Sequence, residues 1–137
     1  MIEAYSKNIN VDANSAIPLN NVSLLKGCST TQEGTSTIVL NKRGIYEVNV
    51  SAIVTSATAA DVITIQLQKD GVSIPQAIGA FTVDTADNVG TIAFTTLIQV
   101  PQDNNCNCPC SIPTRISLLN AGDAATIQSI VISVVRV

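Results

Sequence analysis

The sequence predicts an all-β fold, a single-domain jelly-roll β-sandwich of about eight strands. Val, Ile and Thr dominate runs in which apolar and polar residues alternate with a period of two, as they do in half-buried strands. Turn residues interrupt these runs at short intervals, and no segment of useful length has helical periodicity. The length of 137 residues suits one domain with one hydrophobic core.

The strands follow one another along 36–137, which we expect to form the sandwich. In order, they are "STIVL", "GIYEVNVSAIVTSA", "DVITIQLQ", "VSI", "AIGAFT", "VGTIAFTTLIQV", "TRISLLN" and "ATIQSIVISVVRV". The third and fourth are joined by "KDG", a hairpin signal in which Gly supplies a positive φ. The region 1–35 has the weakest pattern, so we expect an irregular or edge segment there, a candidate for attachment.

Two of these strands, "VGTIAFTTLIQV" and the last strand, are apolar on both faces. One face of the last strand carries Ile130, Ile132 and Val134, and the other carries Ile127, Val131, Val135 and Val137. One face fills the core, and the other needs a cover, either a loop or a neighbouring subunit. Charged residues make up only 12% of the chain, against about 25% in ordinary domains, which favours a subunit interface. We expect this interface at Ala93, Leu97, Ile130, Ile132 and Val134.

The composition argues against several functions. The chain has no histidine, so Ser–His and Cys–His nucleophile pairs are excluded, and its two Phe and two Tyr are few for a sugar-binding cleft. Its seven basic residues are scattered, so we expect no nucleic-acid partner. No apolar run is long enough for a membrane helix, and no secretory signal opens the chain, so we expect no membrane partner. We expect neither enzymatic activity nor a cofactor.

Three segments resemble the trimeric jelly roll of the tumour-necrosis-factor and complement-head family. In "VLNKRGIYEVNVSAIVTS", Gly44 precedes Tyr46 and alternating valines, and "ITIQLQKDGVSI" is similar to the next hairpin. In "ISLLNAGDAATIQSIVISVVRV", Gly122 and Asp123 stand where the family has a Gly–Asp turn. The resemblance covers 36–137 and implies a homotrimer packed through small and aliphatic residues. It extends to phage head fibres and to the C-terminal domains of spore-surface glycoproteins, although the chain has no Gly-X-Y stalk.

The four cysteines allow three interpretations. Cys106, Cys108 and Cys110 alternate in "NNCNCPCS", whereas Cys28 lies far upstream. The three clustered thiols could bind zinc, but the spacing is not that of paired Cys-x₂-Cys motifs and no histidine completes the set. They could instead remain reduced in a loop. We favour a disulfide that joins Cys28 to one of the three or joins the loop to a neighbouring subunit, because particle surfaces mature into oxidising surroundings.

Acidic residues in predicted loops form a further candidate site. Asp84, Asp87 and Asp103 could offer carboxylate oxygens to a cation. The loop around Asp84 and Asp87 lacks the Gly and terminal Glu of an EF-hand, and a solvated turn is the favoured interpretation.

The functional expectation is a non-enzymatic structural protein of a virion. It would be a trimeric jelly roll that forms a phage head fibre or a capsid decoration, with other virion proteins as partners. The alternative is a receptor- or glycan-binding module of a phage tail or a spore surface. Such a module should expose aromatic residues or an apolar cleft at one end of the trimer, and the scarcity of aromatics favours the structural role.

Overall fold

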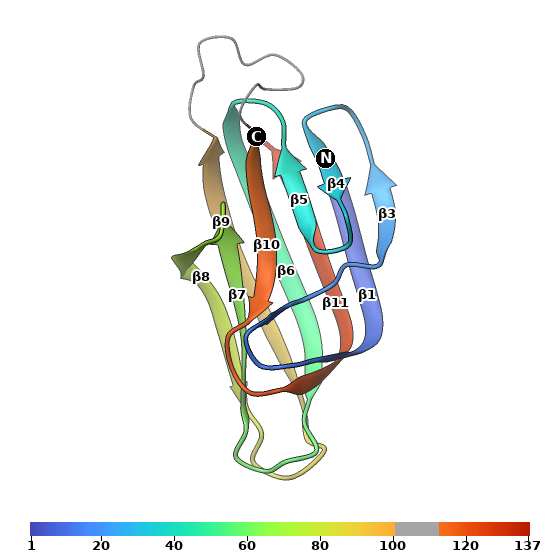
Figure 1. Ribbon diagram of the computed structural model, residues 1–137, viewed down its shortest axis with the longest axis vertical. Coiled ribbons are helices and arrows are strands. Elements are labelled where there is room, and N and C mark those ends of the chain that lie inside the picture. Colours follow the sequence, from blue (N-terminus) through green and yellow to red (C-terminus); the bar gives the residue numbers. More distant parts are fainter. Residues whose placement is uncertain (101–112) are drawn as a thin grey trace.

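The computed structural model describes residues 1–100 and 113–137 (Figure 1). The strands are β1 (Ile2–Val11), β2 (Ser15–Ala16), β3 (Asn21–Leu25), β4 (Thr30–Glu33), β5 (Thr37–Leu40), β6 (Gly44–Thr55), β7 (Val62–Lys69), β8 (Val72–Thr82), β9 (Val89–Val100), β10 (Thr114–Asn120) and β11 (Ala125–Arg136). The described ranges contain no helix that could cross a membrane. The predicted all-β fold is confirmed.

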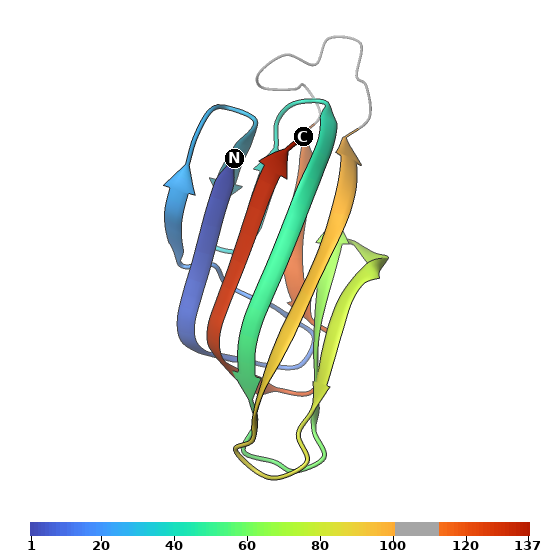
Figure 2. The same ribbon diagram turned by 180° about the vertical axis from the view of Figure 1, so that it is seen from behind.

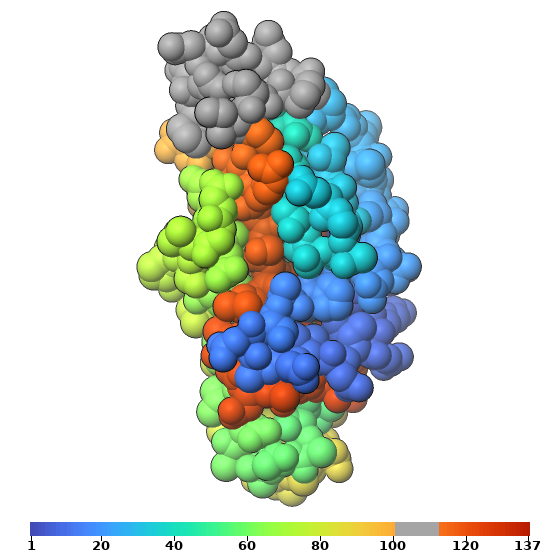
Figure 3. All heavy atoms as spheres, in the orientation of Figure 1, coloured from blue at the N-terminus to red at the C-terminus, as the bar shows by residue number. Residues whose placement is uncertain are grey.

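Two antiparallel sheets face each other and enclose the core (Figures 1 and 2). Sheet A has the strand order β3-β1-β11-β6-β9. Sheet B has the order β4-β5-β10-β7-β8, and the short β2 pairs with β10. In Figure 3 the blue segment that contains β2 lies over the orange β10. The first and last long strands, β1 and β11, are therefore neighbours, and strands distant in sequence pair throughout. This topology is the jelly-roll sandwich that the sequence predicts.

The prediction that 1–35 is irregular is wrong for β1, which pairs with β11 along its whole length inside sheet A. The alternation is weak because the inner face of β1 carries Ala4 and Ser6 among its buried residues. The hydroxyl of Ser6 donates to the carbonyl of Pro18 (2.7 Å) and accepts from the N–H of Asn20 (2.8 Å). β3 and β4 each lie at an edge of one of the two sheets.

The core is mostly aliphatic, and Phe81 and Phe94 pack against it on the side where β8 and β9 meet. Glycines make this packing possible. A Cβ atom on Gly79 would lie 2.5 Å from Cγ2 of Ile92, and one on Gly90 would overlap the ring of Phe81. The largest fully buried side chains are Tyr46, Ile2, Ile17, Leu19, Ile38, Leu40, Ile63, Ile65, Leu67, Ile116, Leu118 and Ile127.

The turn between β7 and β8 is the tight hairpin that "KDG" predicts. Lys69 pairs with Val72, so the loop has two residues. Both of them lie in the left-handed region, Asp70 with φ 52° and Gly71 with φ 82°. Two-residue hairpins with positive φ at both positions match the natural twist of paired strands.

A wide bulge follows this turn on β8. Gln68 pairs with Ser73 and Gln66 pairs with Ile78, so residues 74–77 lie opposite Leu67 alone. The buried amide of Gln66 holds the bulge, because its nitrogen donates to the carbonyls of Ile74 (2.6 Å) and Ala77 (3.1 Å). A buried side-chain amide thus replaces the backbone hydrogen bonds that the bulge interrupts.

Asn120 joins two loops at the opposite end of the sandwich from the β7–β8 turn. Its side-chain nitrogen donates toward the carbonyls of Val11 (3.3 Å) and Asp123 (3.0 Å). Its side-chain oxygen accepts from the N–H of Gly122 (3.1 Å). The residue is only 1% exposed, so these bonds satisfy a polar group that would otherwise be buried without partners.

Candidate functional site

The outer face of sheet A is the surface that the sequence marks as an interface. We use this name for the outward side chains of β6, β9 and β11, the strands that run side by side in Figure 2. Strand alternation sends every second residue outward. The outward residues include Glu47, Asn49, Ser51, Ile53, Thr91, Ala93, Thr95, Leu97, Ser129, Val131, Ser133 and Val135.

This face combines exposed apolar side chains with small polar ones. Leu97 is 59% exposed and Ile53 is 41% exposed. Between them lies a depression of about 400 Å³, lined by Asn49, Val50, Ser51, Ala93, Phe94, Thr95, Val131 and Ser133. On these three strands only Glu47 brings an outward charge, while Glu3 and Lys7 lie on the outward side of the neighbouring β1. A concave, nearly uncharged surface of this kind has the composition of an interface centre.

A short chain of hydrogen bonds crosses the same face. The hydroxyl of Thr95 donates to the side-chain oxygen of Asn49 (2.6 Å). The side-chain nitrogen of Asn49 then donates to Oε1 of Glu47 (3.0 Å). The register explains the contact, since Asn49 lies directly opposite Thr95 on the paired strand β9. The sequence did not predict these hydrogen bonds, because only the pairing of β6 with β9 brings the residues together.

The structure divides the five predicted interface residues into two groups. Ala93 and Leu97 lie on the outer face of sheet A, as predicted. Ile130, Ile132 and Val134 are at most 1% exposed and lie in the core cluster, so their assignment to an interface is wrong. Their outward neighbours on β11 are Val131 and Val135. Both faces of β11 carry aliphatic residues. The only feature of the sequence that marks the outward face is its two serines, Ser129 and Ser133, which lie there together with Val131 and Val135.

Cys28 lies between β3 and β4 and is disulfide-bonded. Its predicted involvement in a disulfide is confirmed. The other candidates, Cys106, Cys108 and Cys110, lie outside the described residues, and the zinc prediction for them lies there too. The carbonyl of Cys28 accepts a hydrogen bond from the side-chain nitrogen of the buried Asn41 (3.3 Å). The start of β4 is thus joined to the loop before β6.

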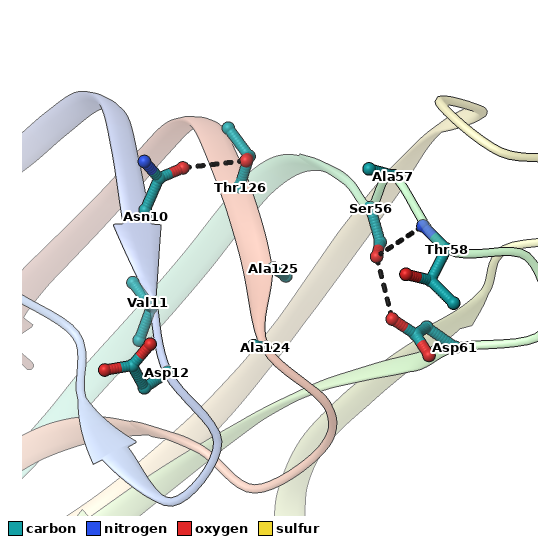
Figure 4. Close-up of a pocket in the computed structure, with 10 residues that line it drawn as sticks. All are labelled: Asn10, Val11, Asp12, Ser56, Ala57, Thr58, Asp61, Ala124, Ala125 and Thr126. Atoms are coloured by element: carbon teal, nitrogen blue, oxygen red, sulfur yellow. Dashed lines mark hydrogen bonds between the residues drawn. The ribbon is translucent and has the colours of Figure 1, made fainter.

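A polar depression of about 310 Å³ lies at one end of the sandwich, where the ends of β1 and β6 meet the start of β11 (Figure 4). Figure 4 shows the carboxylates of Asp12 and Asp61 on opposite sides, with Ala124 and Ala125 between them. The hydroxyl of Ser56 donates to Oδ2 of Asp61 (2.8 Å). The lining of this depression contains no aromatic or basic side chain. The hydroxyl of Thr126 donates to the side-chain oxygen of Asn10 (2.8 Å), which joins β11 to β1 at its rim.

Two of the three predicted cation residues lie within the described residues. Asp84 and Asp87 lie in the loop between β8 and β9, and Asp103 lies outside the described residues. The N–H of Asp87 donates to the carbonyl of Ser56 (2.8 Å), which fixes the loop through its backbone. No group of three or more Cys, Asp or Glu residues in the described ranges is arranged to hold a metal ion.

Tyr46 is the one fully buried aromatic residue of the described chain. Its hydroxyl donates to the carbonyl of Lys42 (2.7 Å) and accepts from the N–H of the same residue (3.3 Å). Burial raises the pKa of Tyr46 above its ordinary value, and the Lys42 backbone and the charge of Arg136 partly oppose this change. The side chain therefore anchors the β5–β6 loop and has no catalytic partner within the described residues.

Comparison with known proteins identifies the fold. No protein-family model and no curated protein matches the sequence. Among solved structures, Eiger TNF from S. frugiperda matches 99% of this chain and 92% of its own, with a TM-score of 0.68 and 13% identity. Murine APRIL matches with a TM-score of 0.65 and 8% identity, covering 99% of this chain and 98% of its own. The chain has the tumour-necrosis-factor-like jelly-roll fold.

A third solved structure with the same fold is named as a vertex protein. The PRD1 vertex protein P5 matches 99% of this chain and 95% of its own, with a TM-score of 0.61 and 16% identity. Identities this low show a common fold and nothing finer. The resemblance seen in the sequence is therefore confirmed for the jelly roll, while the phage type and the homotrimer remain predictions.

Proposed function

We propose that this chain is a non-enzymatic structural protein of a virion, assembled as a homotrimer and mounted as a phage head fibre or a capsid decoration. Other virion proteins are its expected partners. The proposal has two parts, the assembly of three copies and their place on a particle, and different observations support them.

The outer face of sheet A carries the assembly part. Leu97 and Ile53 are among the more exposed large apolar residues, and they lie on the same face as Ala93, Val131 and Val135. Burying such a surface releases about 25 cal/mol for each Å² of apolar area. One charged group, Glu47, would be removed from water, and Asn49 already donates a hydrogen bond to it. Another copy that covers the face would therefore have to accommodate one carboxylate, which Asn49 stabilises in part.

The fold supports the virion part. A protein named as a vertex protein has the same jelly roll over nearly the whole length of this chain. The chain also has few charged residues, as expected of a protein whose surface is largely buried in a large assembly. Each of its four aromatic residues is buried or only partly exposed, which disfavours the alternative of a receptor- or glycan-binding module.

The assembly is tested by substituting Leu97 with Asp. A charge on the buried part of an interface costs several kcal/mol, so we expect Leu97→Asp to give folded monomers where the unchanged protein gives trimers. Val72→Asp is the matched control, since Val72 is 69% exposed on β8, away from this face. Native mass spectrometry and sedimentation measure the mass. A monomeric unchanged protein, or a trimer of Leu97→Asp, would refute the proposed interface.

The place on a particle needs a separate test. Antibodies against the purified protein should label intact particles in electron micrographs of the virus that encodes it, and the labelled sites should disappear when the gene is deleted. Labelling of a spore coat instead would support the alternative module.

A further inference from the structure

Strand β3 is an edge strand with exposed side chains on both of its faces. It pairs only with β1 and ends sheet A. All five of its residues are exposed, with Val22 at 41%, Leu24 at 41% and Leu25 at 54%. Among the described residues, no strand lies beside the other side of its backbone. An uncharged, apolar strand edge is a template for pairing with a further strand.

The other sheet edges carry features that discourage such pairing. On β4, Glu33 forms an ion pair with Arg115 (3.1 Å). On β8, Pro75 lies in the bulge held by Gln66, and proline cannot donate to a strand partner. The long β9 lies against β8 of the other sheet. Charges, prolines, bulges and covers are the usual protection of edges. β3 has the irregularity at Ser23, but within the described part of the chain it has no charge, proline or cover.

Polar contacts hold β3 in place for pairing. The register with β1 shifts between Glu3 and Ala4, and Ser23 lies at this irregularity. The hydroxyl of Ser23 donates to Oε1 of Glu3 (2.9 Å), and the N–H of Lys26 donates to the carbonyl of Met1 (2.9 Å). The apolar side chains are therefore presented on a fixed backbone.

We propose that β3 binds an extended segment of another protein, which adds a strand to the free edge of sheet A. A row of backbone N–H and C=O groups is satisfied most fully by another extended backbone. The segment would be uncharged over about five residues, with apolar side chains against Val22, Leu24 and Leu25, and an acidic residue beside Lys26. The proposal rests on the proposed function for the source of the segment, a protein of the same particle.

The size of the edge argues against a second copy as the occupant. Five residues span about 17 Å, so two β3 strands would bury far less than the roughly 800 Å² per partner of a stable interface. Three such edges on a trimer would also link trimers into an unlimited network. A separate protein that supplies one segment to each edge avoids this, and three simultaneous contacts would strengthen its attachment.

Amide hydrogen exchange of the full chain, followed by NMR, tests the proposal. The probe is a peptide of alternating Thr and Val residues with one terminal Asp, added to about 1 mM, where even a weak strand pair is populated. We expect the outward amides of β3 to exchange at least about tenfold more slowly with the peptide present. A fully N-methylated peptide keeps the side chains but cannot donate hydrogen bonds, and it should give no protection.

Variants of the chain give the second arm. Val22→Lys should abolish the protection, because a charge on the strand blocks apolar pairing. Val62→Lys should not abolish it, since Val62 is equally exposed (39%) but lies on β7. Circular dichroism confirms that both variants fold. Absence of protection at β3, equal protection by the methylated peptide, or protection that grows with protein concentration alone would overturn the proposal. The mass of each sample, measured alongside, reports on the trimer independently.

Discussion

On β11, Ile132 is 1% exposed in the core, while its neighbour Val131 is partly exposed on the outer face of sheet A. Both are β-branched aliphatic residues that suit a strand equally well. The difference between them comes from sheet B, which covers one face of sheet A and leaves the other open. Apolar residues on one face of a strand build the fold, and those on the other face are available for assembly.

The sharpest test of this comparison exchanges the two neighbours for Asp. Ile132→Asp places an unpaired charge in the core, and we expect a loss of more than about 4 kcal/mol of unfolding free energy, a large part of the roughly 5–15 kcal/mol typical of a domain. Val131→Asp should leave the fold intact and abolish the trimer. Circular dichroism and thermal melts measure the fold, and sedimentation measures the mass. An Ile132→Asp chain as stable as the unchanged protein would show that the core assignment is wrong.

A second pair changes volume instead of charge. Ala52 is 2% exposed on the inner face of β6, so Ala52→Leu should overpack the core and cost about 1–3 kcal/mol of unfolding free energy. Ser51, the adjacent residue, lines the depression on the outer face. Ser51→Leu should change the unfolding free energy of the isolated chain by less than about 0.5 kcal/mol. Urea titrations of the two variants should therefore separate, and equal midpoints would contradict the comparison.

A third test uses the buried hydroxyl of Tyr46 on the inner face. Its pKa is raised by burial from an ordinary value near 10, so the folded state holds the proton more tightly than the unfolded state. The resulting stabilisation is complete below about pH 10 and is lost as pH rises through the folded-state pKa. Melts between pH 8 and pH 11 should show a steeper alkaline decline for the unchanged protein than for Tyr46→Phe, with Tyr5→Phe as control. Equal alkaline declines in the unchanged protein and in Tyr46→Phe would contradict this role of the Tyr46 hydroxyl.

The smallest expected effect concerns salt. Because Glu47 is the only charged side chain among the outward residues of β6, β9 and β11, assembly through these three strands should depend little on ionic strength. Raising NaCl from about 0.05 to 1 M, which shortens the Debye length to about 3 Å, should leave the trimer fraction unchanged or slightly increased. Dissociation by salt in sedimentation experiments would instead place the interface on a charged surface.

The strands from β5 onward could be predicted because alternation and turn residues agree there. The "KDG" turn and the long strands β6, β7 and β9 follow period-two patterns with few exceptions. β1 could not be predicted, because its inner face includes Ser6, whose burial is possible only through bonds to Pro18 and Asn20. A polar residue satisfied by a distant segment carries no local signal of its burial.

The interface was predicted only in part for a related reason. On β9, exposed Thr91, Thr95 and Gln99 alternate with buried Ile92 and Ile98, and this marks the outward side where Ala93 and Leu97 lie. On β11 the two faces are nearly equal in hydrophobicity. Which face meets the other sheet depends on the pairing with β1 and β6, including the bulge between Ile127 and Ser129. Long-range pairing, and not local pattern, decides such strands.

The bulge on β8 gives the hairpin room to vary in length. Pairing is set on one side by the turn at Asp70 and Gly71 and on the other by the pairs from Gln66 and Ile78 onward. Residues 74–77 lie between these two fixed registers, so an insertion or deletion there need not turn a core residue outward. Related chains should therefore differ in length at this point more readily than elsewhere in β7 or β8. We expect the chains that keep the bulge to keep a Gln at position 66.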